Sequence, residues 1–106
     1  MWDDPAKPLP ILICPAKISA TLNKRIRALV IRALNVLGVQ DWARVDLRLD
    51  ATGKPNLLEL NPLPGILPDP GENSALPAAA RAAGYDYDEL ILKVAAIALR
   101  RFCLLK

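Results

Sequence analysis

The chain has 106 residues, of which 53% are apolar and 24% are charged, and its formal net charge is +3. This length suits a single domain over residues 1–106, and no apolar run is long enough to span a membrane. The first residues, Met1-Trp2-Asp3-Asp4-Pro5, are acidic and lack the apolar segment of a signal peptide, so we expect a cytoplasmic protein without a membrane partner.

The first predicted elements are a short strand at residues 8–13 and a helix that begins after Ser19 or Thr21 and stops at Gly38. Apolar residues recur along this helix at helical spacing: Leu22, Ile26, Leu29, Val30, Ala33 and Leu37. The other face carries basic residues: Lys24, Arg25, Arg27 and Arg32. This spacing is typical of a solvated helix surface, which we favour over a contact with nucleic acid.

The next predicted element is an antiparallel hairpin. Residues 43–49 and 56–60 alternate between apolar and polar side chains, which is the period of a half-buried strand, and residues 50–54 have turn chemistry. A loop of two residues, Thr52 and Gly53, sets these facing pairs: Arg44 and Asn61, Val45 and Leu60, Asp46 and Glu59, Leu47 and Leu58. The ligand-type residues then share one face of the hairpin, together with Leu57.

Two carboxylates and a carboxamide on one face suggest a metal site. Asp46, Glu59 and Asn61 offer hard oxygen ligands, which suit Mg²⁺ better than zinc in a chain with no His and no paired Cys. Magnesium held by few carboxylates is usually completed by phosphate oxygens, which points to a nucleotide. Opposed carboxylates repel each other, and we expect Arg44 to compensate part of this repulsion. The alternative to a metal site is a solvated face with a surface cluster of Arg, Asp and Glu.

Two further helices complete the prediction. One spans about residues 74–83 and stops at Gly84, and the other opens at Asp86 with Glu89 three residues on, as in a capping box. The last helix has a broad apolar stripe that we expect to pack on the apolar face of the hairpin: Leu90, Ile91, Val94, Ala95, Ile97, Ala98 and Leu99. Cys14 and Cys103 are expected to be reduced, partly buried thiols. The predicted fold class is α/β (α+β), a small antiparallel sheet built on a hairpin with about three helices.

Several separated motifs resemble, in order, the C-terminal part of the ATP-grasp ligases, in particular the D-alanine–D-alanine ligase branch. The motifs are Cys14-Pro15-Ala16-Lys17, Arg44-Val45-Asp46, Glu59-Leu60-Asn61, Pro64-Gly65, Ser74-Ala75-Leu76-Pro77 and Ala80-Arg81-Ala82-Ala83-Gly84. The resemblance implies a C-terminal ATP-grasp subdomain. It also implies a ligase that phosphorylates a carboxylate with ATP and lets an amine attack the acyl phosphate.

The resemblance further implies roles for residues around the hairpin. Asp46 would bind one Mg²⁺, Glu59 would bridge two ions and Asn61 would complete the second, with ATP as the nucleotide. Arg44 and the backbone N–H of Gly65 would face the oxyanion of the tetrahedral intermediate. A plain turn between prolines is the alternative for Gly65.

Three more residues would contact the substrates by the same resemblance. Ser74 and the N–H of Ala75 would hold the carboxylate of the acceptor amino acid at a helix start, and Leu58 would line the adenine pocket. The alternatives are an ordinary N-cap for Ser74 and a core leucine for Leu58. The loop at residues 62–73 looks longer than in the typical dipeptide ligase and is rich in proline, so the acceptor could differ from D-alanine.

The N-terminal and central domains of the resembling ligases have no counterpart in this sequence, and no glycine-rich phosphate loop is present. We therefore expect half of an active site, inactive alone, that works with the missing ligase domains or self-associates as a dimer. A non-catalytic remnant or interaction module is the alternative. A small basic nucleic-acid binder is a weaker one, because aromatic residues are scarce and no basic stripe is continuous.

Overall fold

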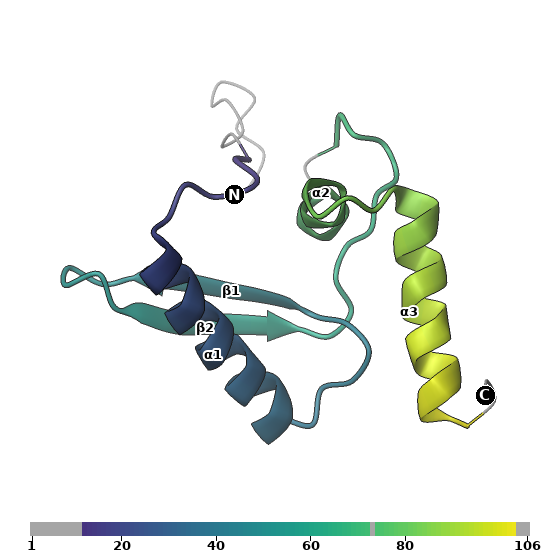
Figure 1. Ribbon diagram of the computed structural model, residues 1–106, viewed down its shortest axis with the longest axis horizontal. Helices are drawn as coiled ribbons and strands as arrows, with labels where there is room; N and C mark the ends of the chain where they lie inside the picture. The colour runs from purple at the N-terminus through teal and green to yellow at the C-terminus, as the bar shows by residue number, and fades with distance from the viewer. Residues whose placement is uncertain (1–11, 73, 104–106) are drawn as a thin grey trace, which may run out of the picture.

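The computed structural model describes residues 12–72 and 74–103. Along the chain these residues form helix α1 (Ala20–Val36), strands β1 (Arg44–Leu49) and β2 (Pro55–Asn61), and helices α2 (Ala75–Ala82) and α3 (Tyr87–Arg101). The described sheet consists of β1 and β2, paired antiparallel. Figure 1 shows α1 lying across this hairpin, with α2 and α3 on the other side of the molecule. The predicted fold class is confirmed.

The ends of α1 follow from local chemistry. The Ser19 side chain caps the helix by accepting a hydrogen bond from the N–H of Leu22 at 3.1 Å. At the other end Gly38 has a φ of 66°, which an L side chain adopts at a cost. The N–H of Gly38 bonds to the carbonyl of Asn35 and that of Val39 to the carbonyl of Leu34. These two bonds make a Schellman motif, so the predicted start and stop of the helix are confirmed.

Helix α2 also begins and ends close to the predicted positions, and α3 begins where the sequence predicts. Asp86 accepts from the N–H of Glu89 at 2.8 Å, and the Glu89 carboxylate accepts from the N–H of Asp86 at 2.9 Å. This capping box fixes the first turn of α3. Gly84, with a φ of 93°, ends α2 in a second Schellman motif.

The register of the hairpin is partly as predicted. Arg44 faces Asn61, Val45 faces Leu60 and Asp46 faces Glu59, which confirms three pairs. The fourth predicted pair is wrong, because Leu47 faces Leu57 and the ladder is irregular between Asp46 and Leu47. Leu58 is therefore an extra residue on β2, in the manner of a β-bulge.

The loop of the hairpin is also longer than predicted. The N–H of Asp50 bonds to the carbonyl of Lys54 at 2.9 Å, so Ala51, Thr52 and Gly53 form the loop. Gly53 has a φ of 81°, as expected for the left-handed third position of such a loop. The extra loop residue shifts the pairing register by one position, and the extra residue Leu58 shifts it back. The pairs beyond the bulge therefore match the prediction.

Asp50 organises this turn with its carboxylate. One carboxylate oxygen accepts from the hydroxyl of Thr52 at 2.6 Å and from the N–H groups of Thr52 and Lys54, both at 2.9 Å. Hydrogen bonds to the charged form favour it. The Thr52 hydroxyl and then the Lys54 N–H lower the pKa of Asp50 to about 2.

The bulge separates the faces of the hairpin more cleanly than the predicted register does. One face carries only apolar residues: Val45, Leu47, Leu49, Pro55, Leu57 and Leu60. Leu57, expected on the polar face, is half-buried on this one. Ala28 and Leu29 of α1 line a shallow groove together with Pro55, so α1 meets this face near the turn.

The predicted packing of α3 on the hairpin is wrong. Helix α3 packs against α2 and stands apart from the strands (Figure 1). Its last turn is tied to the segment before β1 by Arg101, whose guanidinium donates to both carboxylate oxygens of Asp41 at 3.0 and 2.8 Å. The apolar stripe of α3 could not reveal which neighbour it meets, because periodicity identifies a buried face and not the element that covers it.

Little of the described chain is buried. The buried side chains there are Pro55, Pro64, Ser74, Pro77 and Ala80. Large apolar residues lie in solvent, including Val36 at 83% and Leu92 at 68% exposure. Leu37, expected in the α1 stripe, is 65% exposed. The radius of gyration is 15.7 Å, where a compact chain of this length has about 13 Å. The chain thus offers apolar surface for a partner to cover.

Two other predictions concern the chain ends. The expected strand at residues 8–13 lies mostly outside the described residues, and Leu12 and Ile13, which are described, are not in a strand. Cys14 and Cys103 are free thiols and both are exposed, so the expectation of partial burial is wrong.

Candidate functional site

Four of the predicted site residues meet at the end of the hairpin that lies away from its turn. Arg44 and Asp46 come from β1, and Glu59 and Asn61 face them from β2. Residues directly opposed in an antiparallel pair have Cα atoms about 4.5–5.5 Å apart and share a face. The two carboxylates and the carboxamide therefore lie on one side of the hairpin, opposite the apolar face that meets α1.

Arg44 compensates part of the negative charge of this cluster. Its Nε donates to one oxygen of Asp46 at 3.1 Å, and a terminal guanidinium nitrogen donates to the other at 3.2 Å. The two side chains are 36% and 41% exposed, so water screens the ion pair. The predicted compensation is confirmed for Asp46. Glu59 is exposed, and the described residues give it no ion pair.

Asn61 ends the strand and starts the loop that follows. Its side-chain oxygen accepts a hydrogen bond from the N–H of Leu63 at 3.0 Å. This turn directs the chain from β2 toward Pro64 and Gly65. A carboxamide oxygen has two lone pairs, so this bond leaves one acceptor position.

A second group of predicted residues lies along this loop and at the start of α2. Ser74 is only 5% exposed. Its hydroxyl donates to the carbonyl of Gly65 at 3.1 Å and accepts from the N–H of Leu67 at 3.1 Å. Although Ser74 holds the N-cap position of α2, its side chain makes no capping hydrogen bond to the described helix. Ala75, the first residue of α2, follows it.

Gly65 has no local reason to be glycine among the described residues. Its φ is outside the left-handed region, and a Cβ built on it would meet none of their atoms within 4 Å. A turn that required glycine is therefore not the explanation. The space in front of Gly65 is open to a ligand that approaches the backbone closely.

Leu58 is not a core leucine in the described chain. As the extra residue of the bulge it is 63% exposed, whereas its neighbours Leu57 and Leu60 are half-buried. Bulges commonly re-aim a side chain next to a functional site. The bulge presents Leu58 to solvent one residue before Glu59.

The structure thus forms two groups from the predicted residues. Arg44, Asp46, Glu59 and Asn61 meet on the hairpin, and Gly65, Ser74 and Ala75 meet at α2. No described hydrogen bond or ion pair joins the groups across space. Within the described residues no three carboxylates, thiols or imidazoles cluster, so the hairpin offers two carboxylates and one carboxamide.

Sequence reasoning missed Tyr87. Its phenol donates a hydrogen bond of 2.8 Å to the carbonyl of Ile66, which ties the start of α3 to the loop that carries Gly65. The only available signal was an aromatic residue directly after the capping Asp86, which is too common to be informative.

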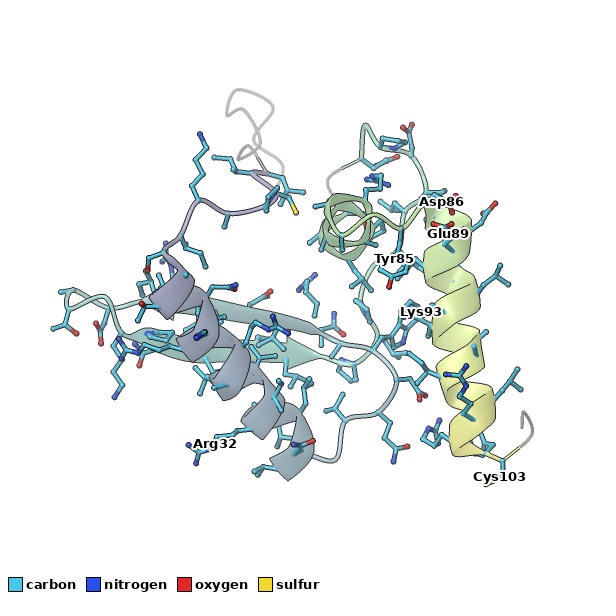
Figure 2. All side chains as sticks on the ribbon, viewed as in Figure 1. Arg32, Tyr85, Asp86, Glu89, Lys93 and Cys103 are labelled. Carbon is cyan, nitrogen blue, oxygen red and sulfur yellow. The ribbon has the colours of Figure 1, made fainter. Side chains whose placement is uncertain are left out.

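Two of the shallow grooves of the described chain lie outside both groups. One, of about 270 Å³, lies between α1 and the hairpin turn and is lined by apolar residues and by Arg25, Arg32 and Lys54. The other, of about 490 Å³, is lined by Cys14, Pro70, Arg81 and other residues beside α2. Figure 2 shows Arg32 on α1, far from Asp86 and Glu89 at the start of α3.

No helix among the described residues has the length and apolar character to cross a membrane.

Comparison with known proteins places this small α+β domain, with its carboxylates and carboxamide on one hairpin, in the class of ATP-grasp ligase domains. Residues 9–96 match the family model described as D-ala D-ala ligase C-terminus. The chain belongs to this family.

Individual relatives agree. The chain is 42% identical over 86 residues to a D-alanine–D-alanine ligase of Cupriavidus pinatubonensis, an alignment that covers 81% of this chain and 25% of the relative. It is 40% identical over 88 residues to one of Nitrosococcus oceani, which covers 83% and 27%. A ligase of Methylococcus capsulatus is 41% identical over 78 residues, which covers 74% and 24%. The chain therefore spans about a quarter of the length of these relatives.

Proposed function

We propose that this chain is the Mg²⁺- and ATP-binding C-terminal portion of a carboxylate–amine ligase that acts through an acyl phosphate. The observation that carries the proposal is the direct opposition of Asp46 and Glu59, with Arg44 and Asn61 as the adjacent pair. A stable hairpin needs none of these four side chains, and opposed carboxylates disfavour it.

The donor set fits magnesium. In the proposed site Asp46 would hold one Mg²⁺, Glu59 would be a ligand of two, and Asn61 would complete the second with its free acceptor position. Water and phosphate oxygens would supply the other ligands of both ions, as is usual for Mg²⁺ bound with a nucleotide. When bound, the metal ions neutralise charge on the phosphoryl group in transfer. Leu58, exposed beside Glu59, offers an apolar surface for the adenine ring.

The remaining residues act on the carboxylate and the amine. Arg44 and the N–H of Gly65 stabilise the oxyanion that forms when the amine attacks the acyl phosphate. The open space at Gly65 supports this role. Ser74 and the N–H of Ala75, at the start of α2, hold the carboxylate of the acceptor. D-alanine is the first acceptor to test, because the relatives are D-alanine–D-alanine ligases.

The single domain proposed for residues 1–106 supplies half of the active site. The other half comes from ligase domains that bind the first substrate and grip the nucleotide, or from a second copy. Exposed apolar residues such as Val36 and Leu92 support a partner of this kind. ATP as cosubstrate is consistent with a cytoplasmic location.

The test is a calorimetric titration of the purified chain with MgATP, repeated with Glu59→Gln. Glu72→Gln is the matched control, because Glu72 is an exposed loop residue outside the hairpin. We expect heat from the wild type and the control and at least about tenfold weaker binding for Glu59→Gln, since one metal ligand loses its charge. Equal binding by all three proteins would contradict the proposed metal site. No heat from any of them would favour the non-catalytic remnant.

A further inference from the structure

The loop after β2 is held by two hydroxyl groups, one at the N-cap of α2 and one in the first turn of α3. Ser74, at the start of α2, contacts the carbonyl of Gly65 and the N–H of Leu67, both at 3.1 Å. Tyr87, the first residue of α3, donates to the carbonyl of Ile66 at 2.8 Å. Three consecutive residues, Gly65, Ile66 and Leu67, are therefore each fixed by one side-chain hydrogen bond.

Both hydroxyls belong to residues that are themselves held in place, by capping bonds for Tyr87 and by burial for Ser74. The capping box of Asp86 and Glu89 fixes the first turn of α3, and Tyr87 lies inside that turn. Ser74 is buried at the junction of the loop and α2. Groups whose own positions are fixed hold a loop more closely than groups on a mobile segment.

The two hydroxyls differ in how a bound acceptor would affect their hydrogen bonds. A serine hydroxyl has one hydrogen to donate, and Ser74 gives it to the carbonyl of Gly65. In the proposed function the same hydrogen is donated to the acceptor carboxylate. Binding of the acceptor then removes the partner of the Gly65 carbonyl, while the Tyr87 bond to Ile66 is untouched.

We propose that Tyr87 is a positioning residue, whose phenol keeps the Gly65 loop in place when the Ser74 hydroxyl turns from Gly65 to the acceptor carboxylate. This inference rests on the proposed function for the role of Ser74. The contribution of Tyr87 to loop order is then conditional. Its bond to Ile66 matters most when the bond from Ser74 to Gly65 is broken. The backbone N–H of Gly65 thereby stays directed at the oxyanion while the amine attacks the acyl phosphate.

The test is a double-mutant cycle of Tyr87→Phe and Ser74→Ala in the whole chain, read from ¹⁵N relaxation of the Gly65 and Ile66 amides. We expect each single variant to keep an ordered loop, and the double variant to lower the order parameters of both amides below about 0.6, the range of a flexible backbone. Tyr85→Phe is the matched control, because the described residues give the Tyr85 hydroxyl no hydrogen bond. Independent effects of the two substitutions would overturn the proposal.

The second arm adds D-alanine to the wild type and to Tyr87→Phe. We expect the loop of Tyr87→Phe to become as mobile as in the double variant, while the wild-type loop stays ordered and the Ala75 amide signal shifts in both. If the cycle shows coupling but D-alanine leaves Ala75 and the loop unchanged, the exchange of the Ser74 hydrogen is overturned. That outcome leaves the MgATP titration, and so the proposed metal site, unaffected.

Discussion

Replacing Glu59 by glutamine should stabilise the chain in the absence of metal, although it should destroy the proposed site. Asp46 and Glu59 are direct cross-strand partners, and like charges in that position cost about 0.2–1 kcal/mol. Arg44 already offsets part of this cost through its two bonds to Asp46 at 3.1 and 3.2 Å. We therefore expect Glu59→Gln to gain about 0.2–0.5 kcal/mol, which for a small domain raises Tm by about 1–4 °C.

The assay is thermal unfolding followed by circular dichroism, in chelator and at low ionic strength. The gain should shrink in about 0.15 M salt, where charges are screened over about 8 Å. In an Arg44→Gln background it should grow toward about 1 kcal/mol, because Asp46 then lacks its compensating charge. A fall in Tm for Glu59→Gln would refute the reasoning that the two opposed carboxylates repel each other. A rise in Tm that changes neither with salt nor in the Arg44→Gln background would refute it as well.

Three further outcomes are expected. Asp50 has its pKa lowered to about 2 by its bonds to Thr52 and Lys54, so its stabilising contribution is complete above the unfolded pKa of about 3.9 and is lost as the pH falls toward 2. Tm measured between pH 5 and pH 2 should therefore drop less for Asp50→Ala than for the wild type, and parallel curves would contradict this. Cys14 and Cys103 are exposed and should both react with a thiol reagent in the native chain, and a thiol that reacts only after unfolding would argue otherwise. Because apolar residues are widely exposed, sedimentation at micromolar concentration should show self-association, and a clean monomer would remove that expectation.

Helix boundaries could be read from the sequence because they depend on chemistry within a few residues. Ser19 as an N-cap, Gly38 at the end of α1 and the Asp86–Glu89 pair each act through bonds that span three to five positions. The pairing of Asp46 with Glu59 was also predicted, although from a two-residue loop and a regular ladder, where the structure has a three-residue loop and a bulge.

The details of the hairpin were harder, although one signal was present. Leu57 and Leu58 are two apolar residues in succession within an alternating strand, and this break marks the bulge. Two geometries pair Glu59 with Asp46: a two-residue loop with a regular ladder, and a three-residue loop followed by a bulge. The alternation of polar residues alone therefore could not separate the two geometries.

Tertiary choices were beyond the reach of pattern reasoning. The apolar stripe of α3 predicts a buried face, but α2 and the hairpin are equally suitable neighbours for it. The hydroxyl of Ser74 was expected either to cap α2 or to bind a substrate; it holds the Gly65 loop and does not cap α2, while its contact with a substrate stays a proposal. Such a bond joins positions nine residues apart through a fold that the local sequence does not encode.

The bulge at Leu58 has a consequence for how the hairpin can be altered. Since Leu47 pairs with Leu57 and Asp46 pairs with Glu59, Leu58 is a residue that the ladder skips. Deleting it would close the ladder without changing any partner, and the carboxylates would keep their alignment. The apolar contact proposed for Leu58 and the metal ligands proposed beside it are thus separable by removing a single residue, so the contact could be lost in a descendant that keeps the carboxylates.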